Sequence, residues 1–246
     1  MLRVRNKKVI LELLQGEVVF EKLVVAENLD QDDLTRKIVS QARSMNILIE
    51  TIPRSKMEKR RTGQSHEAII GFLKSPRTVS IKDLFDNLYG QGKEPFFLLL
   101  NKVDFPNNLG VMIRAAFAAG INGVIFQSLT EEFFNEDVVH FSMGTIVRIP
   151  LIKMSIFEAL KELKKNNIKT FALQMGGRVY FEEDLSGPVA FVLGAEKQGV
   201  SDTVSSRCDK KLSIPMSSGI DSLNVSSAAS IVLYEKVRQE TLRIKK

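Results

Sequence analysis

Three polar clusters in the second half of the sequence hold the residue types that could do chemistry. They occupy residues 101–120, 192–200 and 214–227, and between them they offer a guanidinium group, a carboxylate, a hydroxyl and amides. Each cluster directly follows a short apolar run typical of a buried strand. Open α/β sheets bind ligands beyond the carboxyl ends of their strands, so the clusters are candidates for a ligand site.

The first cluster reads NKVDFPNNLGVMIRAAFAAG. Its Asn108 is placed to cap the following helix, because an asparagine side chain accepts hydrogen bonds from free backbone N–H groups. Arg114 lies six residues later, in a helix otherwise built from Val, Ile, Ala and Phe. An arginine inside such a helix is costly without an anion. A structural salt bridge or a side chain that reaches solvent is an equal alternative.

The other two clusters read VLGAEKQGV and IPMSSGIDSLNVSS. Gly194 would let a ligand approach the backbone, and Glu196 puts a carboxylate at the exit of a strand. A plain turn with a solvated glutamate explains the same residues. Ser222 and Asn224 bring a hydroxyl and an amide to the start of the last helix, where capping of that helix is the structural alternative.

These clusters must be positioned by a sheet. Short apolar runs recur from residue 95 onward and alternate with helical patterns, one of which is opened by the capping box that begins at Ser155. Such alternation predicts an α/β fold with a mainly parallel sheet covered by helices on both faces, closed by a long helix over 224–244. The six expected strands lie at 96–100, 123–126, 146–151, 170–173, 189–193 and 212–214.

The first part of the chain predicts a separate, small α/β unit. Helices are expected near 8–14 and from 33 onward, and strands near 22–26, 47–50 and 68–72. Residues 75–94 differ in character, with Ser-Pro and Gly-Gln-Gly around a short amphipathic stretch, as in a connector. We therefore expect a domain at 1–74, a linker at 75–94 and a second domain at 95–246.

Several common enzyme classes are disfavoured by missing patterns. GAEKQG lacks the Lys-Ser/Thr of a phosphate-binding loop, no G-x-G-x-x-G follows a strand, and no G-x-S-x-G occurs. A kinase, a simple dehydrogenase and an acyl hydrolase are therefore disfavoured. Two histidines and a lone cysteine, Cys208, give no metal cluster, so no metal is expected.

The charge balance is compatible with a polyanionic partner. The formal net charge is +6, and five basic residues fall between positions 54 and 61, which a nucleic-acid contact or a solvated loop explains equally well. No apolar run approaches the roughly 18 residues of a membrane span, and no apolar signal core follows the basic N-terminus. A cytoplasmic protein is expected. The basic residues are Arg54, Lys56, Lys59, Arg60 and Arg61.

In this order, the clusters resemble the three motifs of the SpoU (TrmH-like) family of RNA ribose methyltransferases. N-N-L-G-x-x-I-R-A-A is similar to the first motif, V-L-G-A-E-x-x-G to the second and I-P-M-x-x-x-x-x-S-L-N-V-S to the third. P-R-S-K-M and G-Q-S-H, which ends at His66, resemble the family's small RNA-binding domain, related to ribosomal proteins. The resemblance thus covers nearly the whole chain.

The resemblance implies an activity and its partners. It implies methyl transfer from S-adenosylmethionine to a ribose 2′-hydroxyl, by a homodimer whose C-terminal domain contains a deep trefoil knot. The most similar members form 2′-O-methylguanosine in large-subunit ribosomal RNA. An rRNA-binding or protective module without catalysis remains an alternative, and so does a transfer RNA target.

The resemblance also implies residue roles. Catalytic positions match Asn108, Arg114, Glu196, Ser222 and Asn224. Cofactor-binding positions match Gly194, Ile214, Met216 and Leu223. RNA contacts are implied for His66 and the five basic residues already named. Because arginine keeps its proton in proteins, orienting a phosphate is an easier role for Arg114 than acting as the base.

The sequence departs from the family pattern in three places. Phe105 stands where relatives have an aspartate, so a structural carboxylate is missing unless Asp104 replaces it. Lys197 and Gln198 replace a glycine or acidic pair, which changes the charge of the second-motif loop. Glu67 follows His66 in place of glutamine, which bears on the RNA contacts expected there.

Overall fold

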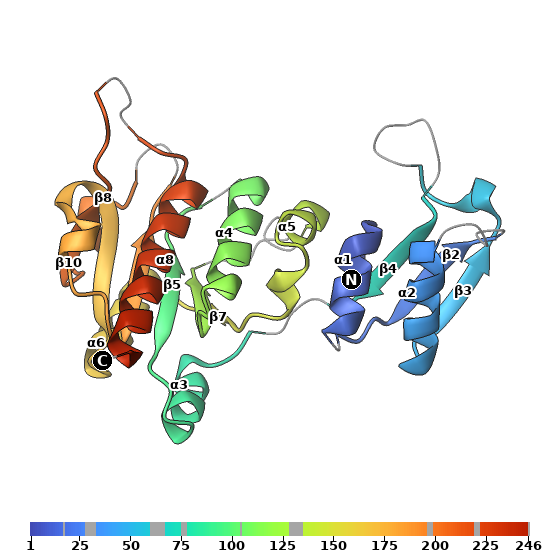
Figure 1. Cartoon of the computed structure of the whole chain (residues 1–246), viewed down its shortest axis with the longest axis horizontal. Helices are drawn as coiled ribbons and strands as arrows, with labels where there is room; N and C mark the ends of the chain where they lie inside the picture. Colours follow the sequence, from blue (N-terminus) through green and yellow to red (C-terminus); the bar gives the residue numbers. More distant parts are fainter. Residues whose placement is uncertain are drawn as a thin grey trace. The chain divides into compact units, whose positions relative to one another are not determined.

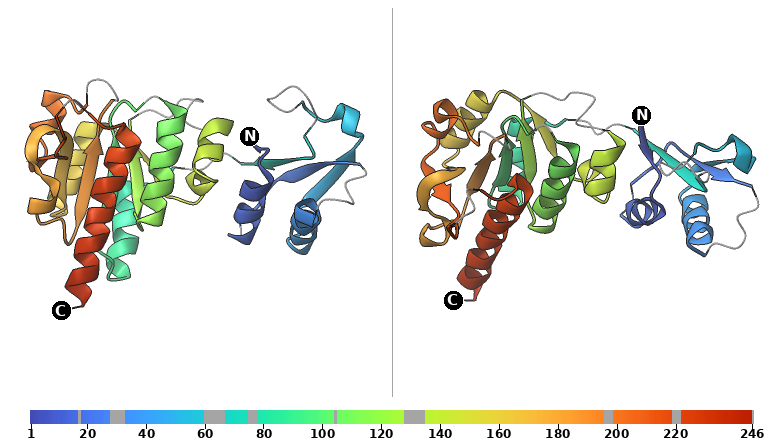
Figure 2. Two further views of the ribbon diagram at one scale, coloured as in Figure 1. Left: turned by 45° about the horizontal axis from the view of Figure 1, so that its top comes forward. Right: turned by 90° about the horizontal axis from the view of Figure 1, so that it is seen from above.

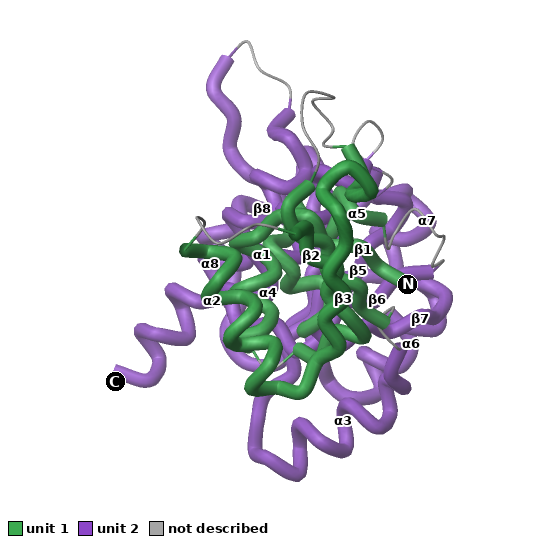
Figure 3. The backbone as a smooth tube through the Cα atoms, turned by 90° about the vertical axis from the view of Figure 1, so that its right-hand side faces the viewer, with its two compact units in different colours: residues 1–76, 134–148 green, residues 77–133, 149–246 purple. Residues whose placement is uncertain are grey.

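The strands of the protein divide into two sheets, each belonging to its own compact unit (Figures 1 and 3). The computed structural model describes residues 1–16, 18–27, 33–59, 67–74, 78–103, 105–127, 135–195, 199–218 and 222–245. Unit 1 comprises residues 1–76 and 134–148, and unit 2 comprises residues 77–133 and 149–246. A segment from the middle of the chain therefore belongs to the N-terminal unit.

Unit 1 contains a mixed four-stranded sheet with the order β1-β4-β2-β3. β2 is parallel to β3 and antiparallel to β4. The expected strands and helices are present, but sequence patterning missed β1, whose three residues are too few to display an alternation. The elements are β1 (Leu2–Val4), α1 (Lys7–Gln15), β2 (Lys22–Ala26), α2 (Asp33–Ser44), β3 (Leu48–Ile52), η1 (Arg54–Lys56) and β4 (Ile69–Leu73).

The middle segment adds α5 (Glu136–Phe141) and η3 (Thr145–Val147) to unit 1. Glu136 forms an ion pair with Arg5 at 3.0 Å, and the Cβ of a residue other than glycine at 144 would lie 2.7 Å from the Leu13 side chain. The strand expected over 146–151 was therefore wrong for most of its length. The apolar run divides between η3 and a strand that begins only at Leu151.

Unit 2 contains a six-stranded sheet with the order β10-β8-β9-β5-β6-β7, in which every neighbouring pair is parallel. The predicted parallel α/β architecture is confirmed. Its elements are α3 (Ile81–Gly90), β5 (Phe96–Leu100), α4 (Pro106–Ala118), β6 (Gly123–Phe126), β7 (Leu151–Lys153), α6 (Ile156–Lys165), β8 (Lys169–Val179), η4 (Tyr180–Glu182), β9 (Val189–Leu193), α7 (Asp202–Ser205), β10 (Lys210–Ser213) and α8 (Val225–Ile244).

Helices cover both faces of this sheet (Figures 1 and 2). On one face, Phe97 and Leu99 of β5 pack in a core with α3, α6 and α7. On the other face, the Lys236 ammonium of α8 lies 5.9 Å from the centre of the Phe96 ring, and α4 packs beside α8. Burial of each such side chain contributes roughly 1.5–3 kcal/mol, which accounts for the unbroken apolar strands. Among the described helices, none is both long and apolar enough to cross a membrane.

Candidate active site

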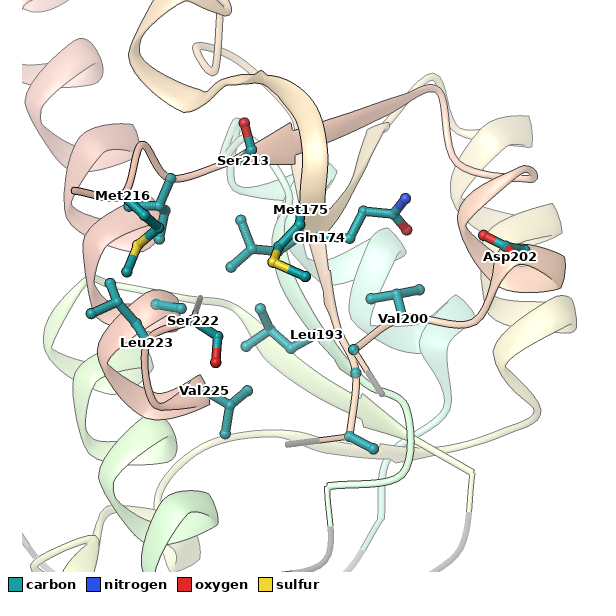
Figure 4. A pocket seen from close by; sticks show the side chains of 16 residues that line it. Gln174, Met175, Leu193, Val200, Asp202, Ser213, Met216, Ser222, Leu223 and Val225 are labelled. Atoms are coloured by element: carbon teal, nitrogen blue, oxygen red, sulfur yellow. The ribbon is translucent and has the colours of Figure 1, made fainter. Parts of the chain in front are cut away.

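A pocket of about 500 Å³ lies at the carboxyl edge of the unit 2 sheet (Figure 4). Because β8, β9 and β10 are parallel, the segments that leave their carboxyl ends meet there. The start of α8 completes the lining. The lining residues belong to 173–175, 193–195, 199–202, 213–216 and 222–228, so the second and third polar clusters of the sequence converge on one cavity.

Gly194 is required by the close packing of the pocket wall. A Cβ at this position would lie 1.9 Å from the backbone carbonyl of Gly199, which no rearrangement of a side chain could relieve. Ala195 and Gly199 form an isolated β-bridge, so the chain turns back on itself directly after β9. Glycine is therefore required at 194 by the protein's own chain, and the expected approach of a ligand to this backbone stays a prediction.

Ile214, Met216 and Leu223 line the pocket, as does Ser222. Figure 4 shows Met216, Leu223 and Ser222 on the same side of the cavity, near the start of α8. The Leu223 side chain is 39% exposed, which is high for a leucine, because the cavity leaves one face of it open. This side of the pocket is thus apolar, with a single hydroxyl group.

Asn224 and Asn108 connect the first and third clusters. The Asn224 side-chain amide nitrogen donates to Asn108 Oδ1 at 3.0 Å, while Asn224 Oδ1 accepts from the Ser226 backbone N–H at 2.9 Å. Asn224 is therefore the N-cap of α8, which was the structural alternative for this residue. The cap expected at Asn108 was wrong, because α4 begins at Pro106 and its N-cap residue is Phe105.

Arg114 lies on the exposed side of α4, away from the face that packs in unit 2. Among the described residues it has neither an ion pair nor a hydrogen-bond partner. Arg114 therefore does not carry the free-energy cost of a buried charge. No salt bridge among the described residues explains why an arginine stands in this apolar helix. Its guanidinium group is open to an external anion.

The remaining predicted residues fall into two groups. Arg54, Lys56 and Lys59 are exposed on unit 1, beside or within η1. The others lie outside the described residues: Glu196, Arg60, Arg61 and His66, together with the departures Asp104, Lys197 and Gln198. Phe105 is exposed, and Glu67 is half-buried.

Sequence reasoning missed the part of the pocket that β8 and α7 supply. Leu173, Gln174 and Met175 follow the regular part of β8, and Asp202 begins α7. The available signal was the same one that marked the other clusters, namely a position just after a buried strand. These residues lacked an unusual residue type to draw attention to them.

Cys208 lies just before the amino end of β10, away from the pocket, and is not a reactive thiol. Burial raises the pKa of Cys208 to about 12, so this cysteine stays a neutral thiol. Within the described part of the chain, no group of three or more His, Cys, Asp or Glu side chains could hold a metal ion.

The pocket fits S-adenosylmethionine, the cofactor implied by the sequence motifs. A cavity of about 500 Å³ is within the range that encloses cofactor-sized molecules. Its apolar side suits a flat aromatic base, and polar side chains of its lining, such as Ser222 and Asp202, suit the polar remainder. Gly194, Ile214, Met216 and Leu223 are the residues that would hold the cofactor.

Comparison with known proteins identifies two family models that cover most of the chain. Residues 95–234 match the SpoU rRNA methylase family, and residues 7–79 match the RNA 2′-O ribose methyltransferase substrate-binding family. The 23S rRNA (guanosine-2′-O-)-methyltransferase RlmB of Photorhabdus laumondii is 31% identical over 86% of this chain and 87% of its own length. RlmB of Escherichia coli K12 is 30% identical over the same shares.

Solved structures have the same fold at lower sequence identity. The SpoU methyltransferase AviRb of Streptomyces viridochromogenes, in complex with AdoMet, aligns with a TM-score of 0.79 at 21% identity, over 97% of this chain and 90% of that one. An AdoMet-bound rRNA methyltransferase of Sinorhizobium meliloti aligns with a TM-score of 0.73 at 22% identity, over 96% and 87%. On the family model and the related sequences together, the chain belongs to the SpoU rRNA methylase family.

Proposed function

We propose that the protein transfers a methyl group from S-adenosylmethionine to the ribose 2′-hydroxyl of a guanosine in large-subunit ribosomal RNA. Membership of the SpoU family carries the reaction class and the cofactor. The RlmB relatives, whose names specify 23S rRNA guanosine, support the base and the type of RNA. The single structural observation behind the proposal is the pocket at the sheet edge, which the second and third motifs enclose.

Methyl transfer requires alignment of the two reacting groups more than it requires a strong general base. When bound, S-adenosylmethionine supplies an electrophilic methyl group on a sulfonium. The protein has to hold the ribose oxygen in line with that methyl group and to lower the cost of removing the hydroxyl proton. We propose that Asn108 and Asn224, joined at 3.0 Å, form one polar wall of the ribose site. Ser222 and Glu196 complete the proposed catalytic set.

Arg114 has the properties of a phosphate-orienting residue. It is exposed, lacks a partner among the described residues and lies on the helix that also carries Asn108. A guanidinium group binds a phosphate through two parallel hydrogen bonds, so it can fix the nucleotide that carries the target ribose. Because it does not lose its proton, the base is another group, for which a phosphate oxygen of the substrate is the simplest choice.

The architecture around this site is part of the proposal. We propose that residues 1–74 bind RNA, with Arg54, Lys56, Lys59, Arg60, Arg61 and His66 as contacts, and that residues 75–94 connect this domain to the methyltransferase domain at 95–246. The helix within this connector, α3, packs in the core of unit 2. As in the family resemblance, the latter is proposed to contain a trefoil knot and to form a cytoplasmic homodimer. The RNA substrate-binding family match over 7–79 supports the first assignment.

The role of Arg114 is tested by the Arg114→Ala variant, with Arg243→Ala as the matched control. Arg243 is also an exposed arginine of unit 2, but it lies in the last turn of α8, about 22 Å along the helix from Ala228 of the pocket lining. Labelled methyl transfer into unmethylated RNA should fall roughly 100-fold or more in Arg114→Ala and stay near the parent level in the control. Full activity in Arg114→Ala would remove this residue from the site.

The two alternatives make different predictions. If transfer RNA is the target, methyl groups should enter tRNA faster than they enter rRNA. The names of the RlmB relatives favour rRNA. A binding module without catalysis would give tight RNA binding and no incorporation with either RNA. Family membership favours an active methyltransferase.

A further inference from the structure

A groove of about 420 Å³ lies in unit 1, between α2 and the edge strand β3. Figure 1 shows α2 beside β2 and β3, the two parallel strands that it connects. One flank of α2 packs beside α1, and the other flank faces the groove. All of the lining belongs to unit 1, so this cavity is separate from the candidate active site. We call it the α2 groove.

Besides the buried Thr35, four side chains of α2 line the α2 groove, because residues three or four apart share one side of a helix. Val39 of this helix and Ile49 of β3 are half-buried and give the groove an apolar floor. Thr51 lies two residues beyond Ile49, so it points to the same face of the sheet and adds a hydroxyl group. The four residues of α2 are Arg36, Val39, Ser40 and Arg43.

The two ends of the α2 groove carry opposite charges. Because α2 runs back from the end of β2 to the start of β3, its last turn, with Arg43, lies at the opposite end of the groove from Glu27, which directly follows β2. Both side chains are exposed, and neither has an ion pair or a side-chain hydrogen bond among the described residues. Arg36, by contrast, is paired with Asp33. Arg43 and Glu27 are therefore both open to a ligand that lies along the groove.

We propose that the α2 groove binds one unpaired nucleotide of the RNA substrate, with its phosphate on Arg43 and its base on the apolar floor toward Glu27. This inference rests on the proposed function. A guanidinium group binds a phosphate through two hydrogen bonds, and a carboxylate accepts hydrogen bonds from the N–H groups of a base edge. Proteins that recognise RNA sequence mostly read such unpaired bases. The substrate-binding family match over residues 7–79 favours RNA over another partner.

The α2 groove is a different surface from the basic residues beside η1. Met57, which directly follows η1, packs with Val24 and Ile70 on the other face of the unit 1 sheet. β3 is the edge strand of that sheet, so one RNA chain that passes around it can contact both surfaces. The inference therefore adds a site for a single nucleotide to the phosphate contacts expected at η1.

The phosphate end of the groove is tested by Arg43→Ala, with Lys37→Ala as the matched control in the full-length protein. Lys37 is also an exposed cation of α2, but it does not line the groove. Each variant removes one positive charge, so a general attraction for RNA falls equally in both. Affinity for unmethylated large-subunit rRNA at about 0.15 M salt should fall about 10-fold or more in Arg43→Ala and stay near the parent value in the control. An equal effect in both variants would overturn the proposal.

The cavity itself is tested by Ser40→Trp, whose large side chain would fill the groove. Lys37→Trp adds the same side chain to α2 outside the groove. Ser40→Trp should weaken rRNA binding about 10-fold or more, while Lys37→Trp binds like the parent and both have similar melting temperatures. If Ser40→Trp binds RNA as well as Lys37→Trp, the groove does not hold a nucleotide.

The base end of the groove is tested by Glu27→Ala. Loss of a negative charge strengthens RNA binding if the carboxylate acts only by repelling phosphates. Loss of an acceptor for base N–H groups weakens it, by about 3- to 10-fold. We expect the weaker binding, and an affinity equal to or above that of the parent would contradict recognition by Glu27.

Two further readouts separate this inference from the proposed function. In Arg43→Ala and Ser40→Trp, the KM for RNA should rise, whereas kcat at saturating RNA and the affinity for S-adenosylmethionine should stay at parent values. A parent that methylates rRNA, with groove variants that bind RNA like their controls, would overturn only the groove. A parent that transfers no methyl group, with groove variants that lose RNA binding, would contradict the proposed function and support the groove.

Discussion

Gly194 is the residue whose substitution the pocket tolerates least. In Gly194→Ala, the new methyl group would meet the Gly199 carbonyl at 1.9 Å, so the backbone after β9 has to move. We expect a loss of about 1–3 kcal/mol in the free energy of unfolding, measured in urea, and the loss of S-adenosylmethionine binding. Gly90→Ala is the control, because open space surrounds that position. A Gly194→Ala protein with parental stability would contradict the wall geometry.

Asn224 combines two roles that substitution can separate. Asn224→Ala removes the cap of α8 and should cost about 1 kcal/mol of stability, whereas Asn224→Ser keeps a capping oxygen and should cost little. Both remove the amide that reaches Asn108. We therefore expect methyl transfer to fall in both variants and thermal stability only in the first. Full activity in Asn224→Ser would limit the residue to capping.

Residue types alone revealed only part of this site. The polar clusters marked Gly194 and Ser222, and the family resemblance added Ile214, Met216 and Leu223. The structure places all five in one pocket. Gln174 was missed because glutamine is an ordinary residue after a strand, and its place in the pocket wall follows only from the folded chain. The helix cap was assigned to Asn108 because asparagine is a favoured N-cap residue. Pro106, which suits the first position of a helix, instead places the N-cap at Phe105.

At the scale of elements, the second half of α8 is tied to the segment between β8 and β9 by carboxylates. The hydrogen bond from Lys210 lowers the pKa of the buried Glu183 carboxyl against the opposing effect of burial, and Arg178 acts in the same direction at 3.0 Å. On α8, the hydrogen bond from Arg238 lowers the pKa of Glu235. Gln239 joins the two groups through the Glu183 carbonyl and the Glu235 carboxylate.

These carboxylates predict the direction of the pH dependence. A carboxyl whose pKa is lower in the folded state stabilises the protein above its unfolded pKa of about 4.3, and this stabilisation is lost as the pH falls through the folded pKa. The free energy of unfolding should therefore fall below about pH 5. Glu183→Gln should cost about 1–3 kcal/mol at neutral pH and flatten the acid dependence, measured by urea titration at several pH values.

Glu182→Gln is the control for that experiment, because its side chain is the exposed neighbour on the same segment. It should leave both the stability and its pH dependence unchanged. An identical acid dependence in Glu183→Gln and in the parent would show that other groups cause the acid loss.

Periodicity predicted the long elements well and the irregular ones poorly. β5, β6 and β9 have the expected bounds, because five or so consecutive apolar residues between turn signals leave little choice. The shift of register between β8 and β10, at Lys211 and Leu212, has no such signature. The apolar run at 146–151 was predicted as one strand. An apolar run does not reveal whether all its residues pack in the same unit, and here the first residues pack in unit 1 and the last in unit 2.

At the scale of the whole molecule, residues 134–148 belong to unit 1, although the residues before and after them in the chain belong to unit 2. Val138, Val139 and Ile146 are fully buried, and α5 contacts β1. A chain that begins at residue 78 should therefore expose apolar surface and aggregate, measured by light scattering and yield. Replacing 135–148 by a short Gly/Ser linker in that chain should restore a soluble protein. A truncated chain that is monodisperse without this replacement would contradict the assignment.

That segment also marks the limit of prediction for the whole chain. The sequence indicated an N-terminal α/β unit and a parallel-sheet unit, since each has its own set of apolar runs that alternate with helical patterns. It did not indicate that residues 134–148 would pack with the first unit, because packing between Gly144 and Leu13 is a contact between distant parts of the chain. Local patterns carry no information on such partners.

The central claim is ribose methylation of a guanosine in large-subunit rRNA, and one measurement tests it most directly. Unmethylated rRNA is incubated with the protein and labelled S-adenosylmethionine, digested to nucleosides and analysed by mass spectrometry, with intact ribosomal subunits as a parallel substrate. The account predicts that the label appears in 2′-O-methylguanosine alone. Label on a base, or no label in either substrate from a protein that binds S-adenosylmethionine, would contradict it.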